Sequence, residues 1–145
     1  MAVTDEQVAT LRAYLAGEFD QYEQLNARLD PGVDGMAYGA LIAAGLFEAV
    51  DRRFAKGATR AQVVDYVGDV RSRSERLSEE IDPQVAERLI MHSLGEGSID
   101  DIDDGIVVHT QLLLLIALVG DERLDDAGLD KFMATTRALG NRLLS

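Results

Sequence analysis

The sequence contains no cysteine, only two prolines and few basic side chains for its length. Without cysteine the chain forms no disulfide, holds no zinc through thiolates and offers no cysteine nucleophile. This composition suits a reducing compartment, and we expect a cytoplasmic protein. The first residues lack a basic region followed by an apolar one, so we expect no secretory signal.

Basic residues are outnumbered by acidic ones, 14 against 26, and the net charge is −12. Contacts to phosphate groups require clustered Lys and Arg, so direct binding to nucleic acid is not expected. Anionic membrane surfaces are disfavoured as partners for the same reason. The charge therefore leaves a protein partner or a small molecule as the expected ligand.

Apolar residues recur every three or four positions along nearly the whole chain, and no alternating strand pattern appears. With 47% hydrophobic residues, 145 residues are enough to bury one core. We predict a single all-α domain over residues 1–145, a helical bundle of five to six helices with a central apolar helix near residues 106–119.

Capping patterns and prolines divide the chain into helices. Thr4 and Thr59 each precede a glutamine by three positions, which is the pattern of a capping box. Asp30-Pro31 and Asp82-Pro83 place proline where a helix begins. Besides the central one, the predicted helices cover residues near 4–29, 34–55, 59–81, 82–95 and 125–144.

Residues 98–122 combine an aspartate cluster with a long apolar run. A calcium loop with Gly105 at its sixth position would have Ile102 and Gln111 where oxygen ligands are required, so it is rejected. The fourteen residues 106–119 would reach about 21 Å, too short for a bilayer core of about 30 Å. The stretch is therefore interpreted as a buried helix that begins near Ser98.

His109 stands where the periodicity of this helix calls for an apolar residue, so we expect it to be buried. Two interpretations are open: a hydrogen-bonded core histidine, or a polar contact in a ligand pocket. Neither histidine has a glutamate three positions before it, and no short catalytic or nucleotide-binding motif is present. We therefore expect no metal site and no cofactor.

Tyr14, Glu18 and Tyr22 are spaced four apart beside the apolar face of the first predicted helix. Such a strip forms either the wall of an amphipathic pocket or an ordinary boundary at which tyrosine rings pack and their hydroxyls reach water. In the first case Glu18 would contact a polar or cationic ligand.

The helix predicted over residues 34–55 has two apolar edges. One, from Met36 through Phe47 to Phe54, is expected to face the core. The other is expected to face a second copy of the chain, because a bundle helix usually buries one face and twofold dimers are the commonest assemblies. The interface candidates are Gly39, Ile42, Ala43 and Leu46.

Two classes of function are compatible with these features. In the first, the protein is a non-catalytic helical interaction or regulatory module that forms a homodimer. In the second, it binds or transforms a small molecule in a pocket between helices, lined by His109 or Glu18. An exposed apolar patch would favour the first class, and a defined pocket would favour the second.

Overall fold

The computed structural model describes residues 1–54 and 58–145, and within these ranges the chain forms eight helices and no strand. The prediction of an all-α bundle is confirmed, with more helices than expected. The helices are α1 (Asp5–Leu15), α2 (Phe19–Arg28), α3 (Pro31–Arg53), α4 (Arg60–Arg71), α5 (Glu75–Glu80), α6 (Pro83–Ser93), α7 (Asp104–Glu122) and α8 (Asp126–Leu144).

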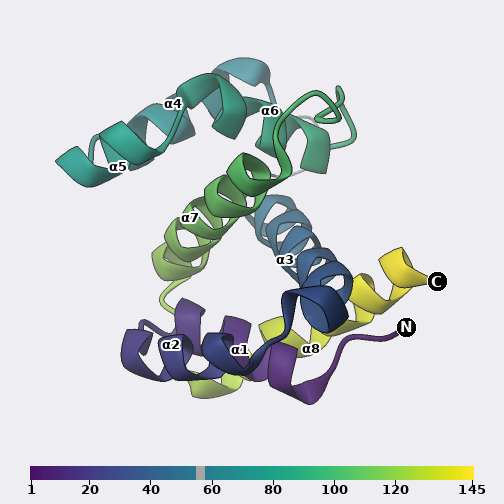
Figure 1. The fold of residues 1–145 in the computed structure, drawn as a ribbon. Helices are drawn as coiled ribbons and strands as arrows, with labels where there is room; N and C mark the ends of the chain where they lie inside the picture. The colour runs from purple at the N-terminus through teal and green to yellow at the C-terminus, as the bar shows by residue number, and fades with distance from the viewer. Residues whose placement is uncertain (55–57) are drawn as a thin grey trace.

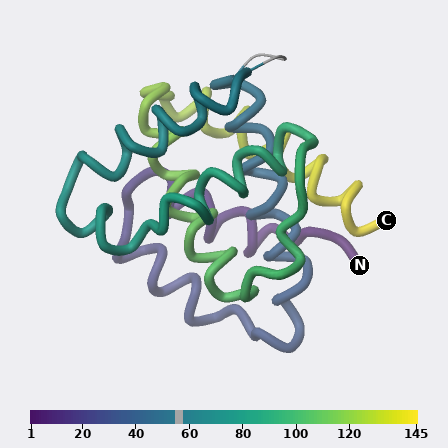
Figure 2. Tube along the Cα trace, turned by 90° about the horizontal axis from the view of Figure 1, so that it is seen from above, coloured from purple at the N-terminus to yellow at the C-terminus, as the bar shows by residue number. Residues whose placement is uncertain are grey.

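Helices α3 and α7 lie in the middle of the bundle (Figure 1). Helices α4, α5 and α6 cover one end of this pair, while α1, α2 and α8 lie at the other end. The chain termini lie close together in both views (Figures 1 and 2), where the Val3 amide donates to Asn141 Oδ1 at 2.8 Å. Helix α3 packs on α6, α7 and α8, so it is the central element of the core.

By length and composition alone, α3 and α7 are apolar enough to cross a membrane. Buried core helices meet the same criterion, and other helices of this bundle pack on both. Leu41 and Ile42 of α3, and Leu114 and Leu115 of α7, are almost completely buried within the chain.

The helix predicted over residues 4–29 is divided in two. Gly17 adopts a left-handed conformation with φ of 77°, which glycine tolerates and which ends α1. The chain then turns, and α2 begins at Phe19. The region near residues 59–81 is also divided, because α4 ends at Arg71 and Ser74 caps the short helix α5. Neither break was predicted.

The close approaches between helices involve Gly45 and Gly140. A Cβ added to Gly140 would lie 3.2 Å from Val3 Cγ2 and 3.4 Å from Leu41 Cα, and one added to Gly45 would lie 3.2 Å from Leu115 Cδ1. By contrast, a Cβ on Gly39 would meet nothing within 4 Å. Glycine therefore allows tight packing between α3 and its neighbours at Gly45 and Gly140, and not at the interface candidate Gly39.

The prediction of which α3 edge faces the core holds only at the C-terminal end of that edge, where Val50 and Phe54 are buried. Farther toward the N-terminus Met36 is 70% and Phe47 is 46% exposed, whereas Ile42 and Leu46, predicted at a dimer interface, are each only 1% exposed. Both edges have helical spacing, so periodicity alone does not distinguish them. The edge with the branched Ile42 and Leu46 side chains fills the space between α3 and its neighbours.

Candidate functional site

His109 is not buried: its side chain is 53% exposed, and this prediction was wrong. The error came from the choice of face, because apolar residues surround much of α7 and periodicity does not single out one buried side. The predicted start at Ser98 was also wrong: α7 is capped by Asp103, whose carboxylate accepts from the Ile106 amide. The buried face of α7 includes Thr110, Leu114 and Leu118 instead.

His109 lines an open cleft between α5 and the start of α7, with a volume of about 560 Å³. Its Nε2 lies 3.8 Å from Glu80 Oε1. Four carboxylates belong to the cleft lining, those of Glu79, Glu80, Asp82 and Asp103. Glu80 also accepts from Arg76 at 2.6 Å, so the carboxylate nearest to His109 already has a basic partner.

Tyr14 and Tyr22 meet although they belong to different helices, with ring centroids 5.1 Å apart. The Tyr14 hydroxyl donates to the Leu112 carbonyl at 3.1 Å, and burial raises the pKa of Tyr14 to about 12. Tyr38 extends this cluster from α3; burial raises the pKa of its phenol, and the neighbouring phenols raise it further. Tyr14 and Tyr22 therefore pack as a structural cluster.

Glu18 is not part of this tyrosine cluster. It is exposed at the start of α2 and lines only a shallow hollow formed by residues 17–21. Its side chain does not cap α2. The structure therefore does not bring Glu18 and His109 into one site, and neither lines an enclosed apolar pocket.

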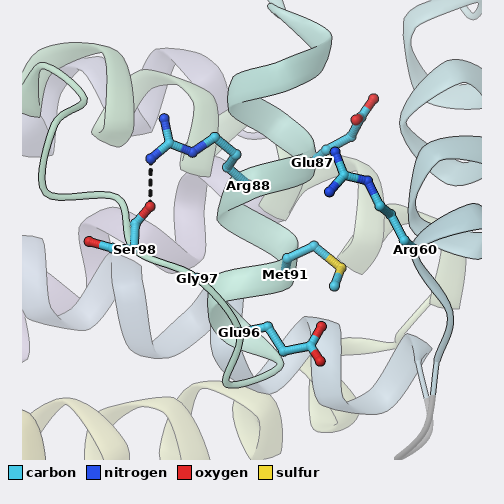
Figure 3. A pocket seen from close by; sticks show the side chains of 7 residues that line it. All are labelled: Arg60, Glu87, Arg88, Met91, Glu96, Gly97 and Ser98. Carbon is cyan, nitrogen blue, oxygen red and sulfur yellow. Dashed lines mark hydrogen bonds between the residues drawn. The ribbon is translucent and has the colours of Figure 1, made fainter.

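A pocket of about 430 Å³ lies between α4, α6 and the loop after α6 (Figure 3). Met91 points into it from α6, with Arg60, Glu87 and Glu96 around it. The remaining charged side chain, Arg88, is occupied: it donates to the Ser98 carbonyl at 2.6 Å and forms an ion pair with Asp101. This pocket is an open surface with mixed charge.

A fourth pocket is mainly apolar, has a volume of about 300 Å³ and is formed by α3, α6, α7, α8 and the loop before α7. We call it the apolar pocket. Its lining consists of Ala43, Ala44, Phe47, Leu89, His92, Ser93, Ile99, Gln111, Leu139, Arg142 and Leu143.

Polar groups occupy two levels of the apolar pocket. Gln111 of α7 is only 7% exposed, and its side chain forms no hydrogen bond with any described residue. Arg142 and His92 are exposed and lie at the outer edge. The His92 ring is fixed there, because its Nδ1 lies 3.1 Å from the Gly97 carbonyl and must donate to it.

Of the residues predicted to be functional, only Ala43 lines this apolar pocket. Gly39 is partly buried beside it on α3, while Ile42 and Leu46 belong to the core. Sequence reasoning missed Gln111, although a polar side chain within a run of leucines was a usable signal. Arg142 had no such signal, because its role depends on which helices meet around it.

Metal ligands are not clustered in the described parts of the chain: no group of three or more His, Cys, Asp or Glu residues could hold an ion there. No protein-family model, curated protein or solved structure matches the chain.

Proposed function

We propose that the protein is a non-catalytic helical interaction module that forms a homodimer through one exposed edge of α3. This α3 edge consists of Val33, Met36, Ala40, Ala43 and Phe47, which are spaced three and four residues apart. That spacing places them along one line of the helix surface. The proposal keeps the class of function expected from the sequence. Of the predicted interface candidates it keeps Ala43, and it replaces the buried Ile42 and Leu46 by the exposed edge of α3.

Large apolar side chains on the α3 edge face solvent in the single chain. Val33 is 73% exposed, and Met36 and Phe47 are also exposed. Each square ångström of apolar surface removed from water contributes about 25 cal/mol. A second copy of the same edge would bury this surface on both chains, and a twofold arrangement closes such a contact.

The observation that carries the proposal is the exposed apolar line of Val33, Met36 and Phe47. The open space beside two of the α3 glycines is compatible with a partner helix on this part of α3. A Cβ on Gly35 or Gly39 would meet nothing within 4 Å, so neither glycine is required for packing inside the chain. A glycine in a helix interior costs about 1 kcal/mol relative to alanine. Gly35 and Gly39 would allow a partner helix to approach closely beside Val33 and Met36, whereas no described helix of the same chain approaches α3 at these glycines.

Sedimentation equilibrium tests the proposal. We expect the wild-type protein to have twice the chain mass of 15.8 kDa at micromolar concentration, and Met36→Glu to have the single mass. The substitution would bury a charge without a partner in the dimer, yet Met36 is exposed in the single chain. The matched control is Val64→Glu on α4, also at an exposed apolar position, which should remain dimeric.

A wild-type mass of 15.8 kDa at all micromolar concentrations would reject self-association. A dimer that persists in Met36→Glu would reject the α3 edge as its interface. Circular dichroism of both variants would verify that each substitution leaves the helices intact.

A further inference from the structure

We propose that the apolar pocket binds a small organic acid whose carboxylate lies at the outer edge, beside Arg142, and whose second polar group contacts Gln111. The body of the ligand between these groups would be apolar, in contact with residues such as Leu89 and Leu139. This site goes beyond self-association, which requires no ligand.

The charged side chains around the apolar pocket favour a negatively charged ligand. The chain has 26 acidic residues, yet no Asp or Glu is among the described residues that line the apolar pocket. The three other pockets described above each contain at least two carboxylates. Arg142 forms no ion pair with any described residue, so its guanidinium is available to a ligand carboxylate.

Gln111 calls for a polar group at the inner end of the ligand. A side-chain amide has two N–H donors and one carbonyl acceptor. The residue Gln111 is more than nine-tenths buried, yet its amide is not among the buried groups without a partner and therefore reaches the space of the pocket. No described residue forms a hydrogen bond with this amide, so a hydroxyl or carbonyl of the ligand could bond to it in place of water.

The volume of the pocket limits the size of this acid. About 300 Å³ lies at the lower end of the range for small-molecule sites, roughly 300–1,000 Å³. At about 30 Å³ for each water-sized group, the pocket holds on the order of ten non-hydrogen atoms. Octanoate and ω-hydroxyoctanoate match this size, and only the second carries a hydroxyl for Gln111.

Isothermal titration of the purified full chain with octanoate tests the anion site. We expect Arg142→Glu to weaken octanoate binding by at least about ten-fold, because attraction becomes repulsion near an apolar surface. Lys131→Glu is the matched control: it makes the same charge change at an exposed position of the same helix, outside the pocket lining, and should bind like the wild type. Octylamine, with the opposite charge, should bind the wild type more weakly than octanoate.

The Gln111 contact is tested by the difference between the two acids. We expect wild-type protein to bind ω-hydroxyoctanoate about five-fold more tightly than octanoate, the value of one hydrogen bond. In Gln111→Leu this preference should disappear while octanoate still binds. Comparing both acids on both proteins distinguishes loss of the Gln111 hydrogen bond from a change in pocket shape, because a change in shape would affect the binding of both acids.

Absence of octanoate binding at millimolar concentration would overturn the proposal, as would equal binding to wild type and Arg142→Glu. An unchanged preference for the hydroxy acid in Gln111→Leu would overturn the inner contact. Arg142→Gln, which removes the charge without reversing it, should weaken octanoate binding less than Arg142→Glu and serves if the latter fails to fold.

Ala43 and Phe47 belong both to the α3 edge and to the apolar pocket, so neither is substituted in these tests. Titrating Met36→Glu separates the two proposals. Octanoate binding by a monomeric Met36→Glu would show that the pocket acts within one chain. A failure of dimerisation in the wild type would leave the predicted ligand contacts unchanged.

Discussion

Of three tyrosine hydroxyls in this protein, two donate hydrogen bonds and one is buried without a described partner, so the same Tyr→Phe substitution should have opposite effects at different positions. The Tyr66 hydroxyl donates to Asp121 Oδ2 at 3.0 Å, and the Tyr14 hydroxyl donates to the Leu112 carbonyl at 3.1 Å. The Tyr38 hydroxyl is buried and has no partner among the described residues. Tyr66→Phe and Tyr14→Phe should therefore destabilise the fold, and Tyr38→Phe should stabilise it.

The magnitudes follow from what each hydroxyl contacts. A hydrogen bond to a charged acceptor contributes about 1.5–3 kcal/mol. Asp121 keeps its ion pair with Arg73 and is partly exposed, so we expect a loss near the lower limit for Tyr66→Phe, about 1.5 kcal/mol. The neutral bond of Tyr14 should cost about 1 kcal/mol, and removal of the unpaired Tyr38 hydroxyl should gain about 1 kcal/mol.

Urea unfolding followed by far-ultraviolet circular dichroism measures these differences, since the chain has no tryptophan to report by fluorescence. All variants must be compared at one protein concentration, because dimerisation adds a concentration-dependent term to the free energy of unfolding. If Tyr38→Phe destabilises the protein as much as Tyr66→Phe, the Tyr38 hydroxyl has a partner and the reasoning is refuted.

Two further predictions concern alkaline pH and helix packing. The folded state raises the pKa of Tyr14 to about 12, chiefly by burial. The stability that depends on its protonated phenol is therefore present below pH 10 and is lost between about pH 10 and 12. Ultraviolet titration of the native protein should show this delayed ionisation, and a normal titration would contradict the burial of Tyr14. In thermal melts Gly140→Ala should lower the melting temperature, because its Cβ would lie 3.2 Å from Val3 Cγ2 with the Leu41 backbone of α3 close behind at 3.4 Å. Gly68→Ala on α4 has open space around it and should stabilise the protein by about 1 kcal/mol. Equal effects of the two substitutions would contradict the close packing at Gly140.

The features that sequence predicted well are those determined by neighbouring residues. Both capping boxes form as expected, with the Thr4 and Thr59 side chains accepting from the amides of Gln7 and Gln62. Such contacts involve residues three positions apart, so they do not depend on the rest of the fold. The same is true of Asp82, whose side chain accepts from amides at the start of α6.

The orientation of the long helices was harder to predict, because it depends on contacts between distant segments. In α7 both the face with Ile106 and His109 and the face with Leu114 and Leu118 have helical spacing, but only the second packs against several other helices. Leucines cover so much of α7 that periodicity does not define one buried side. The wrong prediction that His109 is buried resulted from choosing the wrong face of α7.

The apolar pocket shows why a site of this kind is not visible in the sequence. Gln111, His92 and Arg142 lie on three different helices, and no two of them share a motif or a helical spacing. Gly140 and Gly45 allow α3 to pack closely on α8 and α7, and each glycine is next in the chain to a residue that lines the pocket, Leu139 and Ala44. We therefore expect substitutions that widen either helix crossing to alter binding of the proposed acid without changing any residue that contacts it.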